Sequence, residues 1–99
     1  MRLTDRQRRV IRDAARQAFG PGASVRLFGS RLDDSRKGGD IDLLVETPTL
    51  VEDAGLAAAR MSARIQMQLG ERKIDILYLS PDCSPSPIHR AALERGIRL

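Results

Sequence analysis

Two short apolar segments separated by a long helical segment constrain the fold of this chain more than any other feature. Residues 41–45 and 74–79 are rich in Ile, Leu and Val, and each is bounded by residues typical of turns. The segment between them carries apolar residues at helical spacing up to Gly70. A strand–helix–strand order implies parallel strands joined by a right-handed crossover. The sequence therefore predicts an α/β domain whose sheet is at least partly parallel.

Start and stop signals place the elements before this unit. Thr4 and Gln7 form a capping box that predicts a helix over residues 5–19, ended by Gly20 and Pro21. Residues 24–28 alternate between polar and apolar side chains and end at Gly29, which predicts a short strand opening onto a turn.

Two further capping signals place the helices that follow. A capping box from Thr49 to Glu52 predicts the start of the long helix. Ser86 and Pro87 predict the start of a short last helix, which Gly96 closes. Four apolar residues are predicted to line one side of the long helix: Leu56, Ala59, Ala63 and Met67.

These elements predict one domain over residues 1–99. The order is α-β-β-α-β-α, which gives an α/β (α+β) domain with a three- to four-stranded mixed sheet flanked by helices. A hydrophobic fraction of 41% with 30% charged residues is ordinary for a folded globular chain. A domain of this length has one core and little spare stability.

Composition also excludes several classes of site and location. Cys83 is the single cysteine, which excludes an intramolecular disulfide and a cysteine-rich metal site. The Arg-rich N-terminus has no apolar signal core, and no segment approaches the roughly 18 apolar residues that span a bilayer. We therefore expect a cytoplasmic protein without a membrane segment. His89 is expected to cap a helix or lie at the surface rather than bind a metal.

The net charge of +4, from 17 basic and 13 acidic residues, indicates an anionic partner. Nucleic acid is possible but not favoured, because base-stacking surfaces depend on aromatic side chains and this chain has three. The arginine stripe of Arg9, Arg12 and Arg16 is better explained as the solvated face of a helix. Met61 and Met67 are interpreted as core residues or as residues of a partner interface.

Carboxylates at the starts of two strands carry the functional prediction. Asp40 and Asp42 are separated by one residue, so the strand period of two places both on the same face of the sheet. Carboxylate oxygens are the ligands that Mg²⁺ prefers, and a bound triphosphate completes such a coordination sphere. Asp75 interrupts an apolar run that is expected to form a central strand, where an unpaired carboxylate would be costly. If the two strands are neighbours, Asp75 joins Asp40 and Asp42 around the metal.

The Gly29-Ser30 turn supplies the other half of the predicted site. Glycine lets backbone N–H groups approach a phosphate closely, and a serine hydroxyl can donate to the same phosphate. Arg31 is a candidate phosphate contact, and Arg36 and Lys37 are alternatives that the sequence does not separate.

Together these motifs resemble the DNA polymerase β nucleotidyltransferase superfamily, and specifically its minimal nucleotidyltransferases. The resemblance covers roughly residues 5–99 and is carried by three runs: Phe28-Gly29-Ser30, Asp40-Ile41-Asp42-Leu43-Leu44-Val45 and Lys73-Ile74-Asp75-Ile76-Leu77. It implies a polymerase-β-like fold in which the Gly-Ser turn contacts the triphosphate and the three aspartates bind two Mg²⁺ ions. Many relatives are antitoxins paired with a small helical HEPN toxin, and some transfer AMP from ATP to a toxin tyrosine.

Three hypotheses follow for the function. The first is Mg²⁺-dependent transfer of a nucleoside monophosphate from ATP or another NTP to a hydroxyl acceptor, with Asp40, Asp42 and Asp75 as the catalytic residues. Because 99 residues leave little room for an acceptor domain, we expect the acceptor site to be shared with a HEPN-type partner or a second copy of the chain. The second is an antitoxin that neutralises its partner by contact alone, which the acidic pair Asp33 and Asp34 near the expected phosphate favours. The third is transfer to a small molecule, as in aminoglycoside-modifying enzymes, which carry additional helical domains.

Overall fold

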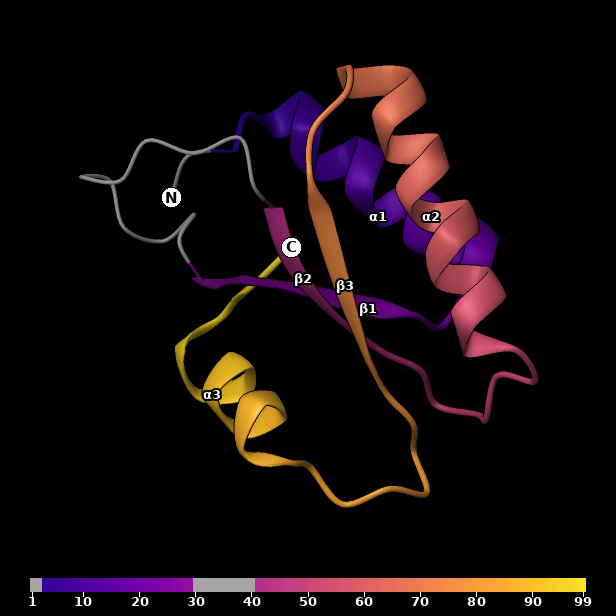
Figure 1. Cartoon of the computed structure of the whole chain (residues 1–99), viewed down its shortest axis with the longest axis vertical. Coiled ribbons are helices and arrows are strands. Elements are labelled where there is room, and N and C mark those ends of the chain that lie inside the picture. The colour runs from indigo at the N-terminus through magenta and orange to yellow at the C-terminus, as the bar shows by residue number, and fades with distance from the viewer. Residues whose placement is uncertain (1–2, 30–40) are drawn as a thin grey trace.

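A computed structural model describes residues 3–29 and 41–99 of the chain. The described part folds into a mixed four-stranded sheet with helices on both faces (Figure 1). Its elements in chain order are α1 (Asp5–Phe19), β1 (Ser24–Phe28), β2 (Ile41–Glu46), α2 (Ala54–Leu69), β3 (Ile74–Leu79), α3 (Pro87–Arg95) and β4 (Ile97–Arg98). The α/β class, the mixed sheet and the order of the longer elements are confirmed.

The sheet has the strand order β3-β2-β1-β4. β2 pairs with β3 in parallel, as the strand–helix–strand order predicts, and β1 pairs antiparallel with both β2 and β4. β4 is only two residues long and follows directly after α3, so its strand pattern is too short to recognise in the sequence. Within this sheet β3 is an edge strand, whereas the sequence analysis expected it to be central.

Helix α1 begins and ends where its local signals predict. The Thr4 side chain accepts a hydrogen bond from the Gln7 N–H at 3.1 Å, and the Gln7 side chain accepts one from the Thr4 N–H at 2.8 Å. These two bonds satisfy N–H groups that the helix itself leaves without partners. Gly20, with φ of 114°, ends the helix in a conformation that few other residues adopt.

The start of α2 differs from the sequence prediction. The helix begins at Ala54, and Asp53 is its N-cap, with its carboxylate accepting a hydrogen bond from the Leu56 N–H at 3.0 Å. The expected capping box from Thr49 to Glu52 is wrong, because the Thr47 hydroxyl donates to the Thr49 carbonyl at 2.6 Å and holds that segment in a non-helical turn.

The apolar residues predicted to line one side of α2 are not the ones that form its buried face. Ala57, Met61 and Ile65 are buried, whereas Leu56 and Met67 are 47% and 84% exposed. Both stripes of α2 have helical spacing and apolar residues, so periodicity alone does not choose between them. The choice is made by α1 and the sheet, which cover only one of the two stripes.

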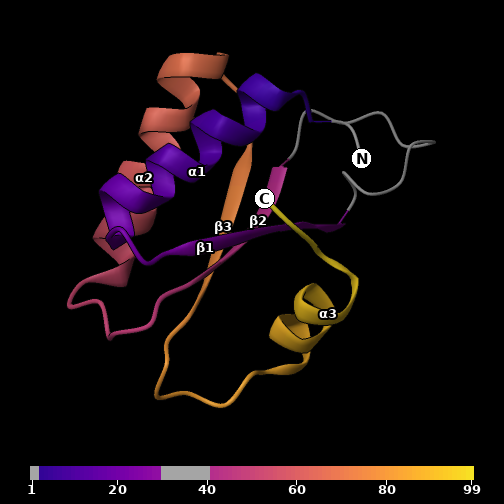
Figure 2. The ribbon, with the colours of Figure 1, turned by 180° about the vertical axis from the view of Figure 1, so that it is seen from behind.

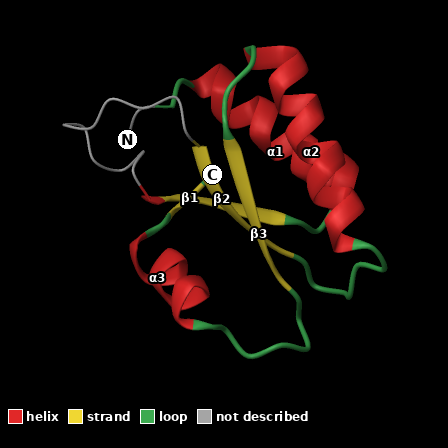
Figure 3. Cartoon of the chain, viewed as in Figure 1, coloured by secondary structure: helices red, strands yellow, loops and turns green. Residues whose placement is uncertain are grey.

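Helices cover the two faces of the sheet unequally. α1 and α2 lie side by side against one face, while α3 lies alone on the other side (Figure 3). The view from behind shows the same separation, with α1 nearer to the viewer than α2 (Figure 2). The main core lies between the sheet and the α1–α2 pair and includes Ile41, Leu43 and Val45 of β2. The smaller core under α3 consists of Leu44, Leu79 and Ala92.

The last helix follows its sequence signals. Ser86 is the N-cap of α3, and His89 accepts a hydrogen bond from the Ser86 N–H through Nδ1 at 3.1 Å. This confirms the capping role expected for His89. The Gly96 N–H then closes the helix on the Ala92 carbonyl at 2.8 Å. Within residues 3–29 and 41–99, the helices are too short or too polar to cross a membrane.

Candidate functional site

Two of the predicted carboxylates lie side by side where β2 and β3 begin. In the parallel register Ile41 pairs with Ile74 and Asp42 pairs with Asp75, and the Ile41 N–H donates to the Lys73 carbonyl at 2.9 Å. Directly paired residues of neighbouring strands project from the same face, and the strands are about 4.8 Å apart. Asp42 and Asp75 therefore share one face of the sheet at adjacent positions.

That face is the one that carries α3. Ile41 and Leu43, which flank Asp42 on β2, are fully buried against α1 and α2. Because side chains alternate along a strand, Asp42 projects on the opposite side together with Leu44. Leu44 packs in the core under α3. The carboxylates thus lie outside the main core, beside the smaller cluster.

The surroundings of Asp75 differ from the sequence expectation. In a central strand an unpaired carboxylate would be buried at high cost, and this cost was the reason to expect a function for Asp75. β3 is an edge strand and Asp75 is exposed, so that cost is absent. The evidence for a role of Asp75 in the site is its register with Asp42. This adjacency was predicted on the condition that the two strands are neighbours.

The turn after β1 brings Gly29 against Asp42. Phe28 pairs with Asp42 across the antiparallel β1–β2 ladder, and Gly29 follows it with φ of +80°. A Cβ atom at Gly29 would overlap the Asp42 carboxylate. Gly29 is predicted to let backbone N–H groups come close to a phosphate. Its contact with Asp42 is a second reason for glycine here, because a side chain would take the space of the carboxylate.

Three predicted site residues lie outside the described part of the chain: Ser30, Arg31 and Asp40. The same holds for the polar segment 31–39, including Asp33 and Asp34. Among residues 3–29 and 41–99 there is no cluster of three or more metal-ligating side chains. The three-carboxylate site therefore stays a prediction, of which the structure places Asp42 and Asp75.

The donor set that is described fits a hard divalent cation. Two carboxylates at adjacent positions of neighbouring strands offer up to four oxygen ligands, and oxygen ligands are those that Mg²⁺ selects. Cys83 lies in the loop before α3 and His89 lies in α3, and neither belongs to a metal-binding cluster of the described residues. The chemistry of the pair thus agrees with the expected metal rather than with a thiolate or imidazole site.

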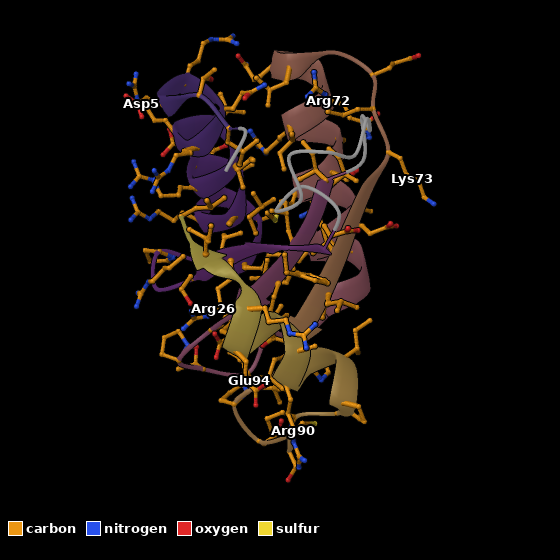
Figure 4. All side chains as sticks on the ribbon, turned by 90° about the vertical axis from the view of Figure 1, so that its left-hand side faces the viewer. Asp5, Arg26, Arg72, Lys73, Arg90 and Glu94 are labelled. Atoms are coloured by element: carbon orange, nitrogen blue, oxygen red, sulfur yellow. The ribbon has the colours of Figure 1, made fainter. Side chains whose placement is uncertain are left out.

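Two cations precede β3 beside this pair, and they differ in environment (Figure 4). Arg72 donates to the Leu69 carbonyl at 3.0 Å, and its Nε is buried without a hydrogen-bond partner in the described residues. Lys73 is exposed and points away from the fold. Neither residue was predicted to have a role, although a basic pair just before Asp75 is visible in the sequence.

The α3 face also holds an ion pair at the other end of β2. Arg26 and Glu46 approach to 3.4 Å, and both side chains are about one-third exposed or less, at 28% and 33%. Arg26 belongs to β1, so the pair connects the two central strands on the solvent side of the smaller core. Such a half-exposed pair contributes little to stability.

Comparison with known proteins identifies the family. Residues 8–98 match the sequence model of the nucleotidyltransferase domain. The chain belongs to the nucleotidyltransferase domain family. Members of this family are transferases, and they use a nucleoside triphosphate and a divalent metal. No match to the chain was found among curated proteins.

A solved structure supports the fold of this nucleotidyltransferase domain. The chain is similar to a chain in the crystal structure of a mutant of the toxin–antitoxin MntA–HpeT, with a TM-score of 0.59 and 16% sequence identity. The match covers 86% of the present chain and 64% of the other, so the present chain spans less than two thirds of that chain. At this identity the likeness shows the fold alone.

Proposed function

We propose that residues 1–99 act as a single nucleotidyltransferase domain that transfers AMP from ATP to a hydroxyl group of a partner protein. The observation that carries this proposal is the packing of Gly29 against Asp42, which is itself paired in register with Asp75. This arrangement joins a turn suited to phosphate with carboxylates suited to a metal, in a chain of the nucleotidyltransferase family.

Two Mg²⁺ ions are the metals that we propose for this site. Asp42 and Asp75, together with Asp40, would hold them through carboxylate oxygens. Ions held there would neutralise phosphate charge and would stabilise the charge that develops in an in-line displacement. Gly29, Ser30 and Arg31 are proposed to bind the triphosphate through backbone N–H groups, a hydroxyl and a guanidinium.

The proposed reaction balances as a single displacement. The acceptor hydroxyl oxygen forms a bond to the α-phosphorus of ATP, and the bond from that phosphorus to the oxygen bridging to the β-phosphate breaks. Pyrophosphate leaves with the bonding electron pair. Asp75 orients the hydroxyl group or accepts its proton. Its exposed position on an edge strand leaves it accessible to an acceptor carried by another chain.

The partner that we propose is a HEPN-type protein. The resemblance to minimal nucleotidyltransferases supports this assignment, and the similar solved structure is that of a toxin–antitoxin. A protein acceptor is consistent with the exposure of Asp75 on the edge strand β3. A second copy of the chain is the other acceptor to consider. We place the reaction in the cytoplasm, where ATP and Mg²⁺ are both available.

Neutralisation by contact alone is the rival function. It is favoured by the toxin–antitoxin identity of the similar structure, because an antitoxin can act by binding without turnover. The two functions differ in whether the carboxylates are needed. Contact neutralisation predicts that changes at Asp42 leave inhibition of the partner intact.

Label transfer distinguishes the two functions. The protein is incubated with Mg²⁺, α-³²P-ATP and the product of the adjacent gene, and labelled protein is counted. We expect transfer by the native chain and a loss of roughly 10²- to 10³-fold in Asp42→Asn, since that change removes a charged ligand without changing volume. Glu46→Gln is the matched control, because Glu46 lies on the same face of the same strand. Inhibition of the partner without any transfer of label would establish contact neutralisation instead.

Metal binding has a readout that does not need an acceptor. Adding Mg²⁺ at about ten times its dissociation constant should stabilise the native chain by roughly 1.4 kcal/mol. Thermal unfolding of Asp42→Asn should show no such gain, whereas Glu46→Gln should keep it. An equal gain in all three chains would show that Mg²⁺ acts elsewhere.

A further inference from the structure

A small hollow beside the edge strand β4 gathers three arginines from two separate elements, and we call it the arginine hollow. Arg12 and Arg16 come from α1, where they are neighbours on the helix surface, and Arg98 comes from β4. The hollow has a volume of about 90 Å³, and its other lining residues are Ala23, Ser24, Val25 and Leu99. The fold therefore brings together positive charges that stand near opposite ends of the sequence.

The positive charge of the arginine hollow has no acidic partner in the described part of the chain. Within residues 3–29 and 41–99, none of the three arginine side chains forms a hydrogen bond or an ion pair. No acidic side chain of those residues lines the hollow. The carboxyl group of Leu99 likewise forms no ion pair there.

Two acidic residues occur close to the lining residues in sequence or register, and both lie elsewhere. Asp13 follows Arg12 on α1, but it lines the groove between α1 and α2. Glu46 pairs in register with Ser24, but its carboxylate forms an ion pair with Arg26 at 3.4 Å. Like charges that gather without a counter-charge repel one another, so a bound anion would relieve an unfavourable arrangement.

We infer that the arginine hollow is a binding site for a phosphate group, carried either by inorganic phosphate or by a small phosphate monoester. Guanidinium groups offer several N–H donors in a fixed plane, which match the oxygens of a phosphate. A phosphate monoester carries about two negative charges, so it balances a three-arginine site better than a carboxylate does.

The size and lining of the hollow limit what is recognised. Apart from the arginines and Ser24, its side chains are those of Ala23, Val25 and Leu99. A nucleotide base would find no aromatic side chain to stack on among these residues. The hollow therefore holds the phosphate group alone, whatever that group is attached to.

The length of β1 separates the arginine hollow from the candidate site. Ser24 and Val25 line the hollow, whereas Phe28 at the other end of the strand pairs with Asp42. Ser24 and Phe28 are about 13 Å apart at the usual rise of a strand. The hollow is thus a second anion site, and the inference stands whether or not the chain transfers a nucleotide.

Amide signals in nuclear magnetic resonance locate a bound phosphate. The chain is labelled with ¹⁵N and titrated with sodium phosphate at constant ionic strength with a chelator present, at about pH 8, where a phosphate ester is a dianion. We expect saturating shifts at Val25 and Leu99, and none at Phe28 and Gly29 beside the candidate site. AMP should bind within about tenfold of inorganic phosphate, because both present the same group. Sodium acetate should cause no saturating shift.

Substitutions assign the binding to the hollow. The double change Arg12→Gln with Arg16→Gln, and separately Arg98→Gln, should each weaken phosphate by about tenfold or more, since each removes charged hydrogen-bond donors. Arg9→Gln is the matched control, because Arg9 is also an exposed arginine of α1 and does not line the hollow. Phosphate should raise the thermal midpoint of the native chain and of Arg9→Gln, but not of Arg98→Gln.

Several outcomes would overturn the inference. Equal weakening in Arg9→Gln would show attraction by the whole basic surface, and shifts confined to Phe28 and Gly29 would place the phosphate at the candidate site. Tighter binding of a single-stranded oligonucleotide than of AMP would assign the surface to nucleic acid. The absence of any saturating shift would exclude a site.

A chain extended by two glycines after Leu99 tests whether a carboxyl group is the anion instead. We expect it to bind phosphate as tightly as the native chain. Binding in the extended chain alone would show that the carboxyl group of Leu99 occupies the hollow, which would also overturn the inference.

Discussion

The two faces of the sheet are built from the same strands but serve different purposes. On the α1–α2 face, β2 contributes three fully buried residues to a continuous core: Ile41, Leu43 and Val45. On the α3 face the same strand contributes Asp42, Leu44 and Glu46, of which only Leu44 is buried. The alternation of one strand therefore places the residues of the main core on one face and the two carboxylates of β2 on the other. A small domain can place its polar site on one face because the other face supplies most of the buried area.

Adjacent leucines of β2 give the sharpest test of this comparison. Leu43 and Leu44 are both fully buried, on opposite faces. We expect Leu43→Ala to lower the free energy of unfolding by about 3–5 kcal/mol and Leu44→Ala by about 2–3 kcal/mol, because the smaller cluster can collapse around the cavity. Urea denaturation measures both. Equal losses would mean that α3 is as essential to stability as the α1–α2 pair.

Gly29 tests how closely the two halves of the site are packed. Gly29→Ala should lower the free energy of unfolding by about 2–3 kcal/mol, since it adds both a strained backbone and an overlap with Asp42. Gly70→Ala is the matched control: Gly70 has φ of +87°, and an added Cβ would meet no atom. It should cost only about 1 kcal/mol.

A second change at Asp42 isolates the overlap. In the double variant of Gly29→Ala with Asp42→Ala, part of the loss should be recovered, whereas Asp42→Ala should not rescue Gly70→Ala. Urea titrations give the free energies of unfolding of the native chain, Gly29→Ala, Asp42→Ala and the double variant. If the two losses simply added, the contact between the turn and the carboxylate would be absent in solution.

The helix face has a polar feature of its own in Tyr78. Its ring stacks on Phe19 with centroids 5.3 Å apart, and its hydroxyl lies 2.6 Å from the Thr47 hydroxyl and accepts from the Val51 N–H at 3.4 Å. Tyr78→Phe keeps the stacking and removes the hydroxyl, so we expect a loss of about 1 kcal/mol. Thermal denaturation measures this loss. Thr47→Val should cost a similar amount, and the double variant should lose less than the sum.

The smallest effect concerns the loop after β3. The Ser80 hydroxyl donates to the Asp82 carboxylate and holds the pKa of Asp82 below its usual value. Because the folded pKa is depressed, this bond adds stability above the unfolded pKa and the gain is lost as pH falls through the folded pKa. Ser80→Ala should raise the pKa of Asp82 in an NMR titration. An unchanged pKa would show that the fully exposed bond does not persist in solution.

Much of the fold follows from local signals in the sequence. The capping box of α1 and the N-cap of α3 at Ser86 are correct because each depends on hydrogen bonds within four residues. The parallel pairing of β2 and β3 is correct because the crossover leaves few alternatives. The start of α2 is wrong because two capping signals compete, and Asp53 provides the bond that the helix uses.

The remaining errors concern tertiary choices. Leu56 and Met61 lie on different apolar stripes of α2, and only packing against α1 decides which is buried. β3 lies at the edge of the sheet, yet it is as apolar as a central strand. It is apolar because α2 covers one of its faces and β2 pairs with one of its edges. For the site, adjacency of Asp42 and Asp75 was predictable from topology, whereas the contact between Gly29 and Asp42 depends on the turn geometry. Ser30, Arg31 and Asp40 stay predictions.

The edge position of β3 bears on how such a domain changes its substrate over evolutionary time. A residue on an inner strand is enclosed by neighbours, and a new acceptor then demands new space in the protein. Asp75 is exposed on β3, and in the described part of the chain no further strand lies on the outer side of β3. In the proposed transfer, a different acceptor would need only a different way of presenting its hydroxyl beside that strand. Surface residues can supply such a change without any change in the core.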